Sequence, residues 1–218
     1  MGNCCSAAAD ELPAATATDI ERIRSKGYLP VVAGPSVDFH GTNQLQTVYI
    51  AEYENGAELT LLFLDEDRPN ACEDCLYDTI RRPLFGRYTD VESVIIIGKE
   101  MVFPGTYAAD QTWKEKMPKH NTATVPMEKF EKHGDGAEFI LWVNTWNHLV
   151  GEQNNNPAME ITHQHAQAAG GKEHIKNKDF VVRKGSRAEV DARFKGIMTS
   201  VSSVMTPERE KQLGKRLW

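Results

Sequence analysis

The strongest constraint on the fold is a pair of apolar segments joined by a two-residue turn signal. Residues 45–54 and 57–64 are rich in β-branched and apolar side chains, and Asn55-Gly56 lies between them. Asn and Gly readily adopt the positive φ angles that a tight hairpin turn requires. The sequence therefore predicts an antiparallel β-hairpin with its turn at Asn55-Gly56.

Other apolar runs predict buried strands, and the segments around them predict helices. Strands are expected over residues 91–97, 139–143 and 180–182. Helix signals, which are caps, prolines and apolar periodicity, lie in six segments: 18–27, 71–82, 108–117, 157–170, 186–201 and from Thr206 onward. Thr18 and Glu21 form a capping box for the first segment, and Ser186 and Glu189 form one for the fifth. Because helices do not alternate one-for-one with strands, the predicted class is α+β, an antiparallel sheet with flanking helices and a helical C-terminus.

Size and composition predict one domain behind a flexible segment. The chain has 218 residues, of which 40% are hydrophobic, enough for one sizeable core. No apolar run approaches the roughly 20 residues that a spanning helix needs. Residues 6–17 are mostly small or polar and include a proline, which is typical of a flexible tether. The expected organisation is a tether over 1–17 and a single globular domain over 18–218.

The first residues carry a chemical signal. Gly2 follows the initiator methionine, with Cys4, Cys5 and Ser6 close behind. This pattern resembles the N-myristoylation signal, and the adjacent thiols resemble the S-palmitoylation sites that accompany it in dually acylated peripheral membrane proteins. The resemblance implies a myristoyl group on Gly2 and palmitoyl groups on Cys4 and Cys5.

A second acyl group matters because one myristoyl chain binds membranes only with a partition constant of about 10⁴ M⁻¹. The alternative second signal, a basic patch, is missing here, since no Lys or Arg precedes Arg22. The start also lacks the basic flank and long apolar stretch of a secretory signal. The expected location is the cytoplasmic face of a membrane, either plasma membrane or endomembrane, in a cell with a eukaryotic-type acylation pathway.

Two groups of residues are candidates for metal binding or catalysis. Asp65 and Asp67 follow an apolar run and, two apart on an extended segment, could share a cation such as Mg²⁺. The pattern is similar to the first motif of haloacid-dehalogenase-type phosphatases and to the metal-binding dyad of some glycosyltransferases. Pro69 departs from the phosphatase motif, which has Thr or Val there. The simpler interpretation is a solvated acidic loop.

Cys72 and Cys75 have the spacing of a redox pair or half a zinc site. The intervening Glu73 and Asp74 disfavour a thiolate, and a structural zinc needs two further ligands. His163 and His165 would supply them only from a strand, whereas the flanking Pro and Gly residues favour a helix, on which residues two apart diverge. Packed cysteines and surface histidines are the simpler interpretation.

These observations favour a binding or interaction protein over an enzyme. Nucleophile elbows and phosphate-binding loops are missing from the sequence, which implies no cofactor. The net charge of −6 argues against nucleic acid as a partner. The expected function is a lipid-anchored peripheral protein that binds membrane lipid through its acyl chains and a protein or small ligand through its domain. The alternatives are an anchored metal-dependent hydrolase or transferase using Asp65 and Asp67, and a hydrophobic-ligand carrier with an internal cavity.

Overall fold

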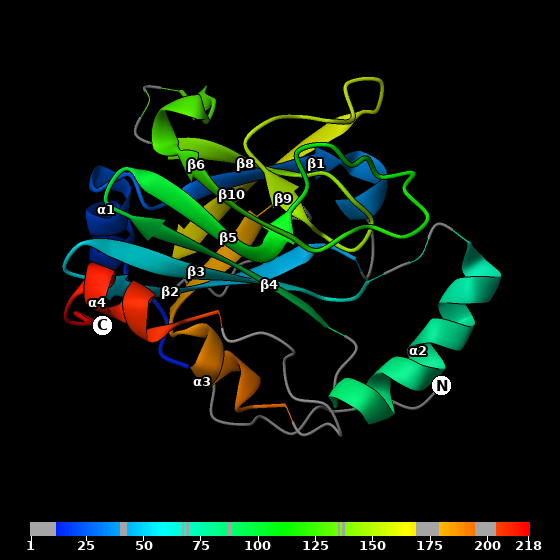
Figure 1. The fold of residues 1–218 in the computed structure, drawn as a ribbon, viewed down its shortest axis with the longest axis horizontal. Helices are drawn as coiled ribbons and strands as arrows, with labels where there is room; N and C mark the ends of the chain where they lie inside the picture. Colours follow the sequence, from blue (N-terminus) through cyan, green and yellow to red (C-terminus); the bar gives the residue numbers. More distant parts are fainter. Residues whose placement is uncertain are drawn as a thin grey trace.

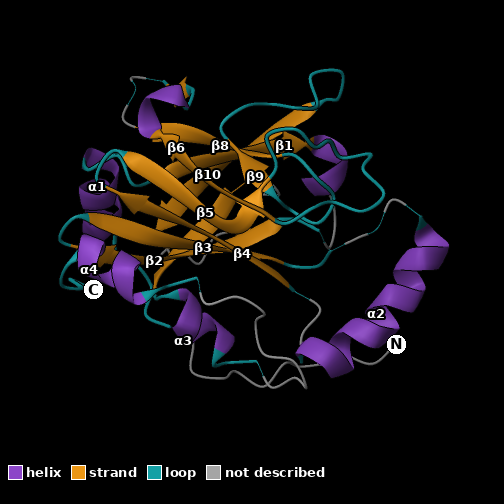
Figure 2. Cartoon of the chain, in the orientation of Figure 1, coloured by secondary structure: helices purple, strands orange, loops and turns teal. Residues whose placement is uncertain are grey.

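The computed structural model describes residues 12–39, 43–66, 68, 70–86, 89–134, 136, 138–168, 179–194 and 204–218. These residues form a closed β-barrel with a few short helices around it (Figures 1 and 2). The prediction of an α+β fold built on an antiparallel sheet is therefore wrong, because the molecule is mostly β.

The strands and helices have the following bounds. The strands are β1 Pro30–Pro35, β2 Leu45–Tyr53, β3 Gly56–Phe63, β4 Asp90–Ile97, β5 Glu100–Tyr107, β6 Asn121–Pro126, β7 Lys132–His133, β8 Glu138–Val143, β9 Val150–Gly151, β10 Ile161–Ala168 and β11 Asp179–Lys184. The α-helices are α1 Ala17–Ser25, α2 Ala71–Phe85, α3 Arg187–Asp191 and α4 Pro207–Leu213, and two 3₁₀-helices span Ser36–Phe39 (η1) and Met127–Lys129 (η2).

The barrel closes through a pairing between strands far apart in the sequence. Neighbouring strands follow the order β1-β10-β11-β2-β3-β4-β5-β9-β8, and β8 then pairs in parallel with β1, so nine strands complete the circle. β6 extends from β5, and β7 from β8. A closed barrel leaves no open edges on these nine strands, which removes the risk of edge-to-edge aggregation.

Alternate side chains of the strands fill the barrel interior. On β3 the inward residues are Leu59, Leu61 and Phe63, which contribute to the main core together with Val32 of β1 and Phe180 of β11. Helix α1 packs against this core and lies at the end of the barrel seen on the left in Figure 1. The inward period-two pattern is the one expected for strands with one buried face.

The predicted hairpin is confirmed, but its turn is not where the sequence placed it. β2 and β3 pair antiparallel with Gly56 opposite Tyr53, so Glu54 and Asn55 make the turn. Neither Asn55 nor Gly56 has a positive φ. Gly56 is required for another reason: a Cβ there would lie 1.9 Å from the backbone oxygen of Ile96 on β4.

The first helix is confirmed, although its cap is one half-turn earlier than predicted. Thr16, not Thr18, is the N-cap, and Asp19 closes the capping box in place of Glu21. The helix ends at Ser25 with Lys26 as its C-cap, and Gly27 follows with φ 70°, as its position suggested.

Among the other predicted helices the outcome is mixed. The helices beginning at Ala71 and Thr206 are confirmed, and the capping box at Ser186 begins α3. Helix α3 ends at Asp191, so the prediction is wrong for residues 192–194, and residues 195–201 of the longer predicted helix lie outside the described residues. Two predictions are wrong: residues 108–117 form turns and loop, and most of 157–170 is strand β10. The three predicted strands are confirmed as β4, β8 and β11.

The described residues before α1 run beside β11. Ala14 bridges Arg183, and the amide of Ala15 donates to the carbonyl of Val182 at 3.0 Å. The division into tether and domain at residue 17 stays a prediction. In the part of the chain described here, no helix combines the length and the apolar character needed to cross a bilayer.

Candidate functional site

Buried polar side chains gather where β3 ends and β4 begins. Residues paired across an antiparallel ladder point to the same face, and Phe63 pairs with Asp90 while Leu61 pairs with Glu92. Phe63 and Leu61 face the barrel interior, so both carboxylates lie on the interior side too, each only 7% exposed. This end of the barrel interior therefore carries two carboxylates.

The loop between β8 and β9 delivers a histidine to this end. The backbone NH of His148 donates to the carbonyl of Thr145 at 3.0 Å, and the Thr145 hydroxyl accepts from the amide of Leu149. This tight turn holds His148 in the left-handed region, at φ 57°. A non-glycine residue with positive φ is uncommon and is usually held by surrounding interactions. The side chain of His148 is fully buried.

His148 lies between an aromatic ring and two carboxylates. Its ring stacks on Phe63 with centroids 3.8 Å apart. Nδ1 is 3.0 Å from Asp90 Oδ2, and Nε2 is 4.0 Å from Asp38 Oδ2 of η1. Burial alone would lower the pKa of His148, but Asp38, Asp90 and Glu66 together raise it above its ordinary value. The surroundings therefore favour a protonated imidazole.

Three side chains at this end carry buried atoms that make no hydrogen bond within the described part of the chain: Asn43 Oδ1, His148 Nε2 and Gln164 Oε1. The side-chain nitrogens of Asn43 and Gln164 already make hydrogen bonds. Asn43 Nδ2 donates to Asp38 at 2.6 Å, and Gln164 Nε2 donates to the carbonyl of Leu45 at 3.3 Å. Their oxygens are thus fixed in position while still able to accept. Leu45 also pairs with Phe63, the ring that stacks on His148, and Asp38, which accepts from Asn43, has its Oδ2 4.0 Å from His148 Nε2. Asn43 and Gln164 are therefore each connected to His148 through one neighbouring residue.

This arrangement suits recognition of a polar molecule. Two oriented amide oxygens accept hydrogen bonds, and a protonated His148 donates one through Nε2. Buried polar atoms normally have partners in a folded protein, so these three atoms are candidates for contact with a bound molecule or with water.

The predicted acidic pair is only partly described. Asp65 lies half-buried just after β3, where its Oδ1 accepts from the amide of Glu66 at 2.9 Å. Asp67 lies outside the described residues, so shared cation binding by the two stays a prediction.

The predicted thiol and imidazole ligands lie on different elements. Cys72 and Cys75 are exposed on α2, which stands to one side of the strands in Figure 2. His163 and His165 lie on β10, so the prediction of a helix for them is wrong, and on a strand they share a face. Among the described residues no three or more His, Cys, Asp or Glu side chains are already arranged to hold a metal ion. Gly2, Cys4 and Cys5 lie outside the described residues.

Sequence reasoning missed Asp38, Asn43, Asp90, His148 and Gln164. One signal was present: Asp90 and Glu92 alternate with apolar residues at the start of a buried strand, a position at which an inward carboxylate is costly unless it has partners. The remaining residues come from η1, from loops and from β10, and the position of β10 depends on barrel closure.

Comparison with protein-family models, with curated proteins and with solved structures finds no match to this chain. The function is therefore argued from the chain's own residues.

Proposed function

We propose that this protein is a ligand-binding β-barrel held at the cytoplasmic face of a membrane by N-terminal acyl groups. The ligand is a small polar molecule with hydrogen-bond donors, and its site is the polar end of the barrel around His148. The observation that carries the proposal is the set of unmet buried atoms on Asn43, His148 and Gln164.

The energetic argument is that these groups are expensive to leave unpaired. A buried polar group without a partner costs about 1–3 kcal/mol, so three cost a large share of a typical domain's stability. Apolar side chains at positions 43 and 164, which are 3% and 0% exposed, would avoid much of that cost. A bound molecule that satisfies the three atoms offsets it.

The chemistry of the site narrows the class of ligand. Amide oxygens accept from amine, amide or hydroxyl groups, and the carboxylates of Asp38 and Asp90 lie nearby. The aromatic faces of Phe63 and Phe39, whose centroids are 6.5 Å apart, provide apolar contact. A small amine or polyol with a compact apolar part fits these groups.

The location half of the proposal rests on Gly2, Cys4 and Cys5. Myristate on the Gly2 amine alone would bind reversibly, and palmitate on either thiol makes release slow. A tethered barrel would meet its ligand close to the membrane surface.

Ligand binding is tested with two variants on the same strand. Gln164→Met removes the interior acceptor while keeping the side chain's length, and Gln167→Met is the control because Gln167 is exposed. The full chain, purified from eukaryotic cells, is weighed intact by native mass spectrometry and screened by thermal shift against small amines and polyols. We expect a bound mass or a stabilising compound for wild type and Gln167→Met, but not for Gln164→Met. A high-resolution crystal structure with only water against Asn43, His148 and Gln164 would refute the ligand site.

Anchoring is tested separately. Gly2→Ala and a Cys4→Ser/Cys5→Ser double variant are expressed in eukaryotic cells and fractionated. We expect wild type in the membrane pellet, the double variant divided between pellet and supernatant, and Gly2→Ala in the supernatant. Equal pelleting of all three would remove the acylation proposal and leave the ligand site untouched.

A further inference from the structure

Three histidines meet on the outside of the barrel, away from the His148 site. His163 and His165 are two apart on β10 and so point to the same side of the strand. His133, from the short strand β7, lies over them, with its ring centroid 5.0 Å from that of His165 and 6.3 Å from that of His163. Residues some 30 positions apart in the chain are thus brought together by the fold.

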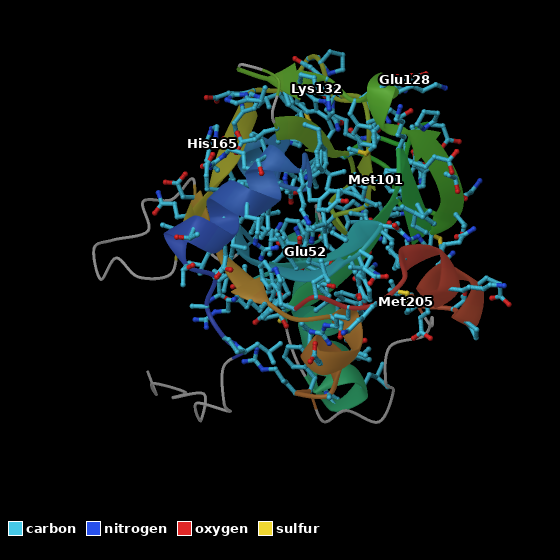
Figure 3. The ribbon with its side chains drawn as sticks, turned by 90° about the vertical axis from the view of Figure 1, so that its left-hand side faces the viewer. Glu52, Met101, Glu128, Lys132, His165 and Met205 are labelled. Carbon is cyan, nitrogen blue, oxygen red and sulfur yellow. The ribbon has the colours of Figure 1, made fainter. Side chains whose placement is uncertain are left out.

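The outward direction follows from the strand register. His163 pairs with Ala33 of β1, which belongs to a small cluster with Trp142 on the outer face of the barrel. The ring of His163 lies edge-on to Trp142 with centroids 5.9 Å apart. All three histidines are half-buried. Figure 3 labels Lys132, next to His133, at the top of the barrel and His165 at its upper left.

The electrostatic environment favours a cation at this place. An imidazole in its neutral form offers a nitrogen lone pair to a metal ion. Two carboxylates are near: Glu131 interacts electrostatically with His163, and Asp179 pairs with His165 across the β10–β11 ladder. Neutral imidazoles beside carboxylates are the usual surroundings of a bound transition metal.

The separations of the rings fit this use after a small side-chain movement. Two imidazoles on one tetrahedral metal have centroids about 5 Å apart, because each nitrogen is about 2.1 Å from the metal. The ring centroids of His133 and His165 already have this separation. The ring centroid of His163 must move about 1 Å closer to that of His133. Within the described ranges no three side chains are arranged to hold a metal ion without this movement, so binding of the ion must draw the three imidazoles together.

We propose that His133, His163 and His165 form a binding site for one divalent transition-metal ion, of the class of Zn²⁺ or Cu²⁺. Imidazole ligands suit these ions, and they do not suit Mg²⁺ or Ca²⁺, which take oxygen ligands. The site does not depend on the ligand site at His148, because the two lie on opposite sides of the barrel wall.

The test titrates Cu²⁺ into the full-length protein and follows tryptophan fluorescence, with Zn²⁺ measured by calorimetry. A Cys72→Ser/Cys75→Ser background removes the exposed thiols. We expect one ion to bind per chain and Cu²⁺ to quench the tryptophan fluorescence. In Trp142→Phe the quenching should be lost, while the affinity for Zn²⁺ should not change. Loss of an outer-shell partner costs about 10–100-fold in metal affinity, so His133→Gln and His165→Gln should each cost at least about tenfold.

His120→Gln is the matched control, because His120 is an exposed loop histidine outside the cluster. The melting temperature without metal verifies that each variant folds, which these outer-face positions should allow. Affinities unchanged in His133→Gln and His165→Gln, or reduced equally in His120→Gln, would overturn the proposal.

Discussion

The imidazole of His148 lies flat on the ring of Phe63, with centroids 3.8 Å apart and an angle of 5° between the planes, while its Nδ1 is 3.0 Å from Asp90. Phe63 ends β3 and Asp90 begins β4, and the two are directly paired. The histidine therefore links two adjacent strands at the polar end of the barrel. Its positive φ shows that the loop is shaped to bring it there.

The first prediction concerns the pH dependence of stability. Asp38 and Asp90 raise the pKa of His148 in the folded state against the opposing effect of burial. A histidine whose pKa is higher in the folded state than in the unfolded state stabilises the fold. This contribution is complete at pH values below the unfolded-state pKa of about 6.5, and it is lost as pH rises through the folded-state pKa. The free energy of unfolding of wild type should therefore fall, relative to His148→Gln, as pH rises above about 6.5.

Urea unfolding followed by tryptophan fluorescence measures this difference. His120→Gln is the control, since it removes an exposed histidine and should show no such trend. A wild-type advantage over His148→Gln that is constant across the range would mean that His148 acts through packing alone.

The second prediction concerns the attachment of α1 to the barrel. The side chain of Glu52 on β2 is fully buried and pairs with Arg22 of α1 and with Lys26, the C-cap of that helix, the latter at 2.7 Å. Burial would raise the pKa of Glu52, but hydrogen bonds from these cations lower it below its ordinary value. Glu52→Gln should therefore destabilise the protein by about 2 kcal/mol, less than for a fully buried pair because both cations are partly exposed.

Glu21→Gln is the matched control. Glu21 pairs with Arg24 on the same helix but its side chain is 71% exposed, so its loss should cost less than about 0.5 kcal/mol. Because the pKa of Glu52 is lowered, its contribution should also disappear as pH falls through its folded value, whereas it is complete above about pH 4.5. Equal costs for the two variants at neutral pH would contradict this assignment.

The third prediction concerns the N-cap of α1, which the sequence analysis placed at Thr18 and the structure places at Thr16. The Thr16 side chain accepts from the amide of Asp19, and the Asp19 side chain accepts from the amide of Thr16. Thr16→Ala should cost about 1 kcal/mol, the typical value of an N-cap. Thr18 is exposed inside α1, and alanine is the better helix former, so Thr18→Ala should be neutral or slightly stabilising. Chemical denaturation of the two variants decides between the caps.

Local signals predicted much of the structure correctly. The hairpin of β2 and β3, the buried runs of β4, β8 and β11, and the caps at Ser186 and Thr206 were all recognisable because each depends on neighbours within a few residues. The class was nevertheless wrong, because closure of the barrel depends on parallel pairing of β1 with β8, about 109 positions apart.

Strand β10 shows why closure of the barrel could not be predicted from the sequence. Its residues, Ile161 to Ala168, include two Ala and two Gln and are flanked by Pro157 and Gly170, which favours a helix locally. Pairing with β1 on one side and β11 on the other outweighs that preference. The histidine cluster and Gln164 both depend on this strand, so neither could be found from local patterns.

The last prediction contrasts Gly56, the first residue of β3, with Gly98 in the turn between β4 and β5. At Gly56 a Cβ would lie 1.9 Å from the carbonyl oxygen of Ile96, so β3 and β4 would have to separate. Gly98 has open space around it but a φ of 59°, so alanine there meets only backbone strain, worth about 1–2 kcal/mol. Because adding a methyl group where the backbone cannot move costs more than such strain, Gly56→Ala should lose at least about 3 kcal/mol. Thermal unfolding by circular dichroism compares the two variants, with Gly98→Asn as a further control, since Asn tolerates positive φ better than Ala. If Gly98→Ala proved the more damaging variant, the close approach of β3 to β4 would not be the reason for glycine at position 56.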